Sequence, residues 1–200
     1  MTISTKTIVK YLLEIIIVAF GVFLGVYFSD LNEIQNTKEE KEKSLTLILE
    51  ELEYNQKLLE EQIDYHEKLK IQMDSVNNVL TDEDRFSSLA DNKDFNHNNI
   101  KGWNGFQFAR LRAVAFESAK ISGILKEFDI QSIQKISSVY VYQESYLSFG
   151  KAILDKAIAT NSSTKLVDFL GIIELMNSDL LNLEKHLSEN LKKVIEDLKS

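Results

Sequence analysis

Residues 11–28 read YLLEIIIVAFGVFLGVYF, an apolar stretch with one charged side chain, Glu14. At about 1.5 Å per residue, a helix of this length spans roughly 27 Å, which matches the hydrocarbon core of a bilayer. No comparable stretch occurs elsewhere in the chain. We therefore predict that residues 11–28 form a transmembrane helix and that the chain is a single-pass membrane protein.

Two other interpretations of this stretch stay open. A cleaved signal peptide needs small residues at its cleavage site, but residues 25–30 read GVYFSD, with bulky side chains at the candidate positions. A buried core helix of a soluble protein is compatible with the short length of the run. We favour the uncleaved anchor over both.

The composition of the 200 residues predicts an all-α fold. Average usage would give about ten prolines, whereas the chain has none, and proline breaks the interior of helices. The net charge of −8 argues against nucleic acid as a partner and against a domain that lies flat on anionic lipid. Because there is no cysteine, neither a disulfide framework nor a thiolate metal site is possible.

The apolar spacing divides the chain into four parts. Residues 1–10 form a short tail before the transmembrane helix of residues 11–28, and residues 29–44 form a charged helical connector. No helix breaker separates the membrane helix from this connector, so we expect it to continue towards a long helix. Residues 45–200 are predicted to form a helical bundle with one loop at residues 81–105. Short turns between consecutive helices favour an antiparallel bundle of about four helices.

The first bundle helix is predicted from a seven-residue repeat that ends near Leu80. All of its positions except His66 are apolar. The six positions are Leu45, Leu52, Leu59, His66, Met73 and Leu80. Asn55 and Gln62 stand where a strict coiled coil needs apolar residues, so packing inside a bundle is favoured over a free-standing zipper. In the loop, Phe95 and Trp103 are expected to attach the chain to the bundle.

Three further helices are expected. The first covers residues 106–121 and ends near Gly123, which can adopt the left-handed conformation of a helix end. Asp129 is expected to cap the next helix, residues 130–160, and residues 161–163 form a turn. The last helix, residues 164–199, has the most regular repeat in the chain, although Asn177 and Glu184 interrupt its second series. Its main series is Leu166, Ile173, Leu180, Leu187 and Val194.

The sequence lacks the motifs of common active sites and predicts neither an enzyme nor a cofactor. The histidines, His66, His97 and His186, lie in different predicted elements, without the spacing of a zinc or di-iron site on a helix. His66 lies on the apolar series, so a hydrogen bond between helices is the expected role. There is no glycine-rich phosphate loop and no Gly-x-Ser-x-Gly turn. Adjacent acids such as Glu50 and Glu51 are expected on solvated helix faces.

Two features of the membrane segment suggest a contact face. Gly21 and Gly25 lie one turn apart, and glycine lets another helix approach closely. Glu14 lies two turns before Gly21 on the same face, and an ionisable group at this depth is costly unless it is paired. A local ion pair between Lys10 and Glu14 near the headgroups is the favoured role of this acid. A contact to another subunit is the second hypothesis, and a proton or ion pathway is the third.

Two blocks of sequence resemble an uncharacterised family of bacterial single-pass membrane proteins. Residues 10–21 read KYLLEIIIVAFG and are followed by DLNE at residues 30–33; the second block, residues 116–125, reads FESAKISGIL. Phe128, Asp129, Val139, Tyr140 and Gln143 continue the second block, and Phe116 stands where that block often has tryptophan. The resemblance implies an N-terminal anchor and a helical extramembrane domain of unknown function. It implies no activity.

These observations lead to a non-enzymatic, membrane-anchored scaffold or accessory subunit as the first functional hypothesis. A ligand-sensing helical module, which relays its state through the long helix to a membrane partner, is the alternative. Lys6 and Lys10 precede the apolar run, and the nine residues after Phe28 contain no Lys or Arg. We therefore expect a bacterial inner-membrane protein with a cytoplasmic N-terminus and a periplasmic bundle. The expected partners are the lipid bilayer and another protein or a second copy.

Overall fold

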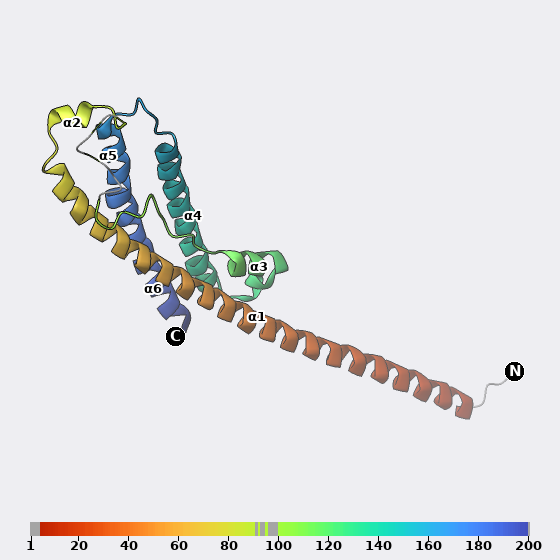
Figure 1. The fold of residues 1–200 in the computed structure, drawn as a ribbon. Coiled ribbons are helices and arrows are strands. Elements are labelled where there is room, and N and C mark those ends of the chain that lie inside the picture. Colours follow the sequence, from red (N-terminus) through yellow and green to blue (C-terminus); the bar gives the residue numbers. More distant parts are fainter. Residues whose placement is uncertain (1–4, 91, 93–94, 96–99, 200) are drawn as a thin grey trace.

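The structure is a computed structural model that describes residues 5–90, 92, 95 and 100–199, with side chains described from residue 12 onward. The chain is all-α, as predicted: helices make up 81% of the structure, and the described residues contain no strand. One long N-terminal helix leads into a bundle in which the other helices pack along its C-terminal half (Figure 1).

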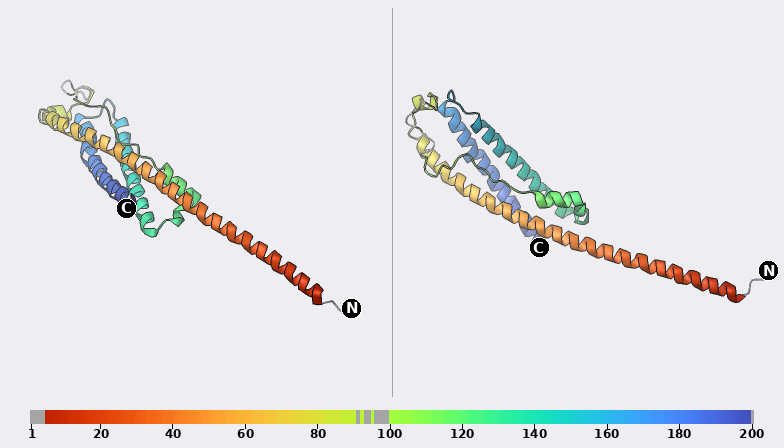
Figure 2. Two further views of the ribbon diagram at one scale, coloured as in Figure 1. Left: turned by 90° about the horizontal axis from the view of Figure 1, so that it is seen from below. Right: turned by 45° about the vertical axis from the view of Figure 1, so that its right-hand side comes forward.

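Helix α1, Thr5–Asn77, runs for 73 residues without a break. At about 1.5 Å per residue it is roughly 110 Å long. Its N-terminal half projects clear of the bundle in both further views, while its C-terminal half lies along the other helices (Figure 2). The continuation of the apolar segment into a long helix is therefore confirmed. Ile48 is the first buried residue of α1 among those described, so packing begins close to the predicted start of the bundle.

The segment after α1 differs from the prediction in two ways. Helix α2, Asp82–Phe86, lies inside the predicted loop of residues 81–105, because Thr81 and Asp84 satisfy each other's backbone N–H groups in a capping box. The described residues between α2 and Val114 contain no helix, so the helix predicted at residues 106–121 starts only at Val114. The expected aromatic attachment of the loop is present: the Phe95 ring lies 6.1 Å from that of Phe169.

Helix α3, Val114–Ser122, ends as predicted at Gly123, whose φ of 78° is left-handed. A 3-10 turn, η2 (Ile124–Glu127), leads to Asp129, whose carboxylate accepts a hydrogen bond from the Ser132 N–H at 2.9 Å. Asp129 therefore caps helix α4, Ile130–Ile158, as the sequence predicts. The predicted end at residue 160 is two residues too late.

Helix α5 (Leu166–Leu175), the π-helical turn η3 (Met176–Leu180) and helix α6 (Leu181–Lys199) follow one another without a gap. All five residues of the predicted main series in this region are buried. The α5–η3–α6 rod is antiparallel to both α1 and α4, but α1 and α4 run in the same direction (Figure 1). They do so because the irregular segment before α3, residues 100–113, returns along the bundle between them. We call these residues the returning segment.

Three ion pairs connect α1 to α6. They are spaced by seven residues on each helix and join Lys185 to Glu67 at 2.6 Å, Lys192 to Glu60 at 3.1 Å, and Lys199 to Glu53 at 2.6 Å. Exposed pairs of this kind contribute at most about 1 kcal/mol each. Their common spacing favours a single register of the two antiparallel helices.

Candidate functional site

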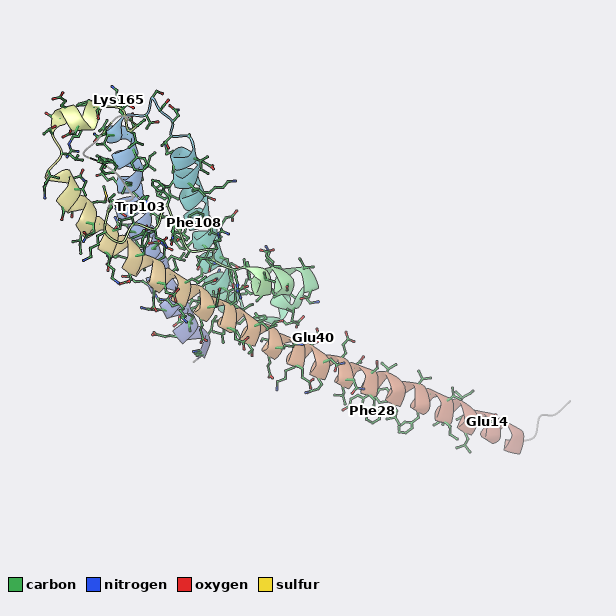
Figure 3. All side chains as sticks on the ribbon, viewed as in Figure 1. Glu14, Phe28, Glu40, Trp103, Phe108 and Lys165 are labelled. Carbon is green, nitrogen blue, oxygen red and sulfur yellow. The ribbon has the colours of Figure 1, made fainter. Side chains whose placement is uncertain are left out.

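The projecting part of α1 carries a continuous apolar surface. Its most apolar 18-residue window has a mean hydropathy of 2.3, and none of that window is buried. Glu14 and Phe28 lie on this part of α1, far from Trp103 and Phe108 in the bundle (Figure 3). By length and composition, α1 is the one helix of the described chain that can cross a membrane. A helix in the core of a soluble protein would instead be covered by its neighbours.

The predicted contact residues of this segment share one side of α1. Gly21 and Gly25 are one turn apart, and Glu14 lies two turns earlier on the same side. A Cβ atom added at either glycine would meet no atom within 4 Å. Packing within the described chain therefore does not require these glycines. The predicted ion pair between Lys10 and Glu14 lies outside the described residues, because the side chain of Lys10 is not among them.

A buried polar network in the bundle centres on Glu184. One carboxylate oxygen lies 2.8 Å from Nδ1 of His66, and the other accepts a hydrogen bond from the Tyr146 hydroxyl at 2.9 Å. The Tyr146 oxygen accepts the Ala109 N–H at 2.7 Å, and Nε2 of His66 lies 3.2 Å from the Gln107 carbonyl oxygen. The network joins α1, α4, α6 and the returning segment. It confirms that His66 makes a hydrogen bond between helices.

A second polar network bonds the backbone of Arg112, at the end of the returning segment, and of Ala115, at the start of α3. Glu51 accepts hydrogen bonds from the Tyr140 hydroxyl at 2.7 Å and from the Ala115 N–H at 2.9 Å, at the N-terminus of α3. Asn55 bonds both backbone groups of Arg112, accepting its N–H at 2.8 Å and donating to its carbonyl at 2.7 Å. These side chains satisfy backbone groups that would otherwise be buried without partners. Both networks therefore stabilise the returning segment.

These networks correct one prediction and explain several irregularities of the sequence. Glu51 was expected on a solvated face, but it is 7% exposed, because its carboxylate caps the start of α3. Asn55 and Glu184 interrupt the apolar series because each bonds to groups inside the bundle. Tyr146 gives no signal in the sequence, since a tyrosine on an apolar face looks like any other core residue.

The histidines do not come together. His66 is buried, His186 is exposed on α6, and His97 lies outside the described residues. Within the described part of the chain, no group of three or more His, Cys, Asp or Glu side chains is arranged to hold a metal ion. The buried His66 is held by the protein's own carboxylate and carbonyl oxygens.

A pocket of about 400 Å³ opens between the last turns of α1, helix α2 and the junction of α5 with η3. This is the end of the bundle away from the N-terminus (Figure 1). Apolar side chains of Met73, Leu170 and Ile173 line it, together with a buried amide, Asn177. The volume lies in the range typical of small-molecule sites. Four charged residues also line the pocket: Lys70, Asp74, Arg85 and Glu174.

Comparisons of the chain with protein-family models, with curated proteins and with solved structures found no match. The resemblance of the two sequence blocks to a family of bacterial single-pass proteins therefore stays a hypothesis.

Proposed function

We propose that the protein is a non-enzymatic, membrane-anchored scaffold or accessory subunit that acts through helix contacts in the membrane and on the bundle. The observation that supports it most is the exposed apolar part of α1, which continues without a break into the longest helix of the bundle. A contiguous apolar surface of this size is rare on soluble monomers. A bilayer around residues 11–28 covers it, and the unbroken helix then fixes the bundle to the membrane.

The proposed location is a bacterial inner membrane, crossed once. Lys6 and Lys10 lie directly before the apolar run, whereas the first basic residue after it is Lys38. Because basic residues concentrate on the cytoplasmic side of a membrane helix, the N-terminus is placed in the cytoplasm and the bundle in the periplasm. The net charge of −8 makes nucleic acid an unsuitable partner.

A protein partner or a second copy is proposed to bind the side of α1 that carries Glu14, Gly21 and Gly25. Nothing within the described chain lies close to the two glycines, so the approach that they permit is open to another helix. Contacts between membrane helices gain from such close backbone packing, because lipid removes the hydrophobic drive between helices. A carboxyl group on the same side gives this face a polar group that a partner can bond.

Extraction in a mild detergent, followed by chemical crosslinking and mass spectrometry, tests the proposal. We expect a second copy or one other membrane protein to be recovered with the chain in stoichiometric amounts. Gly21→Leu should reduce this recovery, whereas Val22→Leu, about 100° around the helix, should not. Recovery of the monomer alone, under conditions that preserve other membrane complexes, would argue against a scaffold or accessory role.

One observation favours the alternative of a ligand-sensing module. Residues of the last turns of α1, among them Lys70, Met73 and Asp74, line the pocket, so one unbroken helix runs from the membrane segment to that site. A sensor then needs a membrane partner to carry the signal further. A ligand that changes recovery of the partner would favour sensing, and a ligand without this effect would favour the scaffold.

A further inference from the structure

We propose that the pocket at the end of the bundle binds a small zwitterion that contains an amide group, either an amino acid with an amide side chain or a short peptide. The proposal does not depend on the scaffold role. It supplies the ligand that the sensing alternative requires.

Asn177 is a buried amide whose hydrogen bonds are unmade. It is 4% exposed, and neither its side-chain nitrogen nor its oxygen has a hydrogen-bond partner among the described residues. Buried polar groups are almost always hydrogen-bonded, because an unpaired one costs free energy. One planar group here offers a donor and an acceptor side by side. The complementary ligand group is another amide: a primary amide offers the opposite pair on one edge, and a trans peptide group offers either its N–H or its carbonyl oxygen.

The residue that carries this amide lies on an unusual turn of the backbone beside the pocket. Asn177 belongs to η3, a π-helical turn between two α-helical stretches of one rod. Single π-helical turns inside α-helices are rare and occur often at functional sites. Met176 and Leu180, at the two ends of the turn, are both buried in the core. Asn177 is the buried polar residue of this turn, and its amide makes no hydrogen bond to the described residues.

Side chains of both charges line the pocket, so a ligand that carries a positive and a negative group complements it. Lys70 and Arg85 supply two cations, and Asp74 and Glu174 supply two anions. A carboxylate suits the first pair and an ammonium group the second. Arg85 is held beside the pocket, because its Nη2 donates to the Asn77 carbonyl at 2.7 Å and its Nη1 donates to the Asn77 side-chain oxygen at 3.5 Å.

The apolar part of the lining accounts for the remainder of such a ligand. Met73, Leu170 and Ile173 are buried, and they present aliphatic surface between the charged groups. The methylene groups of an amide side chain, or the aliphatic side chain of a dipeptide, would bury apolar area there. A volume of about 400 Å³ leaves room for either ligand.

The test measures binding to the full-length protein in lipid nanodiscs by isothermal titration calorimetry and by the shift in melting temperature. The probes are L-glutamine and glycyl-leucine, each at millimolar concentration. L-leucine, a zwitterion without an amide, and acetamide, an amide without charges, are the comparison compounds. We expect at least one probe to bind more tightly than both comparison compounds, and the stronger probe identifies the source of the amide.

Matched variants locate the site. Asn177→Leu should weaken binding of the stronger probe by about tenfold or more, because the ligand's own amide then loses its partners. Asn182→Leu, the same change at an exposed position of α6, should leave binding unchanged. If Asn177→Leu alters folding, Glu174→Gln compared with the exposed Glu189→Gln provides the same comparison at the surface.

Three results would overturn the proposal. One is the absence of heat and of a melting shift for all four compounds. Another is binding that is unaffected by both Asn177→Leu and Glu174→Gln. The third is binding of L-leucine or acetamide that is as strong as that of the stronger probe. Recovery of a membrane partner is measured separately, so failure of the pocket and failure of the scaffold role give different results.

Discussion

The hydroxyl group of Tyr146, on α4, links α6 to the returning segment by two hydrogen bonds. It donates to Glu184 and accepts from the Ala109 N–H in a part of the core where the tyrosine is 1% exposed. Burial, and next the negative charge of Glu184, raise the pKa of Tyr146 far above its ordinary value of 10.0. The phenol therefore keeps its proton in the folded protein at pH values at which an ordinary tyrosine loses it.

This shift predicts a loss of stability in alkaline solution. The unfolded chain releases the phenol proton above a pH of about 10 while the folded chain retains it, so stability is complete below that pH and falls as the pH rises through it. Tyr146→Phe should lower the melting temperature at neutral pH, since Ala109 and Glu184 lose a partner. Above that pH the variant's melting temperature should fall less steeply than that of the wild type. Tyr142→Phe, at an exposed position, is the control and should leave the slope unchanged.

Replacing each of two bundle glycines by alanine is expected to change the stability of the protein in opposite directions. A Cβ atom at Gly150 would lie 2.7 Å from Cγ of Phe108, at the rigid base of the ring, whereas one at Gly171 would meet nothing within 4 Å. We expect Gly150→Ala to destabilise the protein by about 1–3 kcal/mol through overpacking. Gly171→Ala should stabilise it by roughly 0.5–1 kcal/mol, because alanine is the better helix former. Denaturant unfolding of both variants measures the difference, and equal effects would show that Phe108 moves aside freely.

At the scale of the element, α1 combines an exposed apolar segment, the candidate membrane span, with a bundle face on one continuous helix. If Gly21 and Gly25 contact another helix, Gly21→Leu and Gly25→Leu should each weaken association, because the added side chains push the backbones apart. Val22→Leu should not. Glu14→Gln should have a smaller effect than the glycine variants if headgroups already satisfy the carboxylate, and a comparable one if a partner does. A membrane two-hybrid assay can rank the four variants, and wild-type association of both glycine variants would place the glycines against lipid.

Helices with strong periodicity could be predicted from the sequence, and the segment between them could not. The series through Leu59 and the one through Leu187 place α1 and the last rod correctly, because these faces pack against apolar neighbours. Residues 106–113 carry apolar side chains at a helical spacing, but their backbone is bonded by Asn55, Tyr146 and other side chains distant in sequence. Such partners are known only after the fold is known. The pocket has the same origin, since α1, α2 and η3 meet there only in the folded chain.

At the scale of the whole molecule, the length of α1 sets the distance between the apolar segment and the bundle. Residues 29–40 separate the apolar segment from the part of α1 that lies along the bundle, where Lys41 is over the ring of Phe128 at 5.6 Å. Twelve helical residues span roughly 18 Å. If a bilayer surrounds residues 11–28, this stretch holds the bundle away from the lipid surface and leaves most of its own surface exposed to a partner.

The orientation of the whole molecule can be tested cleanly because the chain has no cysteine. Single variants Ser4→Cys, in the N-terminal tail, and Ser118→Cys, on the exposed side of α3, each carry one thiol. If the basic residues before the apolar run set the topology, a membrane-impermeant maleimide added to intact spheroplasts should label Ser118→Cys and leave Ser4→Cys unlabelled. Lysis should make both accessible. Lys38, Lys41 and Lys43 follow the segment within about fifteen residues and oppose this orientation. Labelling of Ser4→Cys alone in intact spheroplasts would mean that these later lysines dominate and that the pocket faces the cytoplasm.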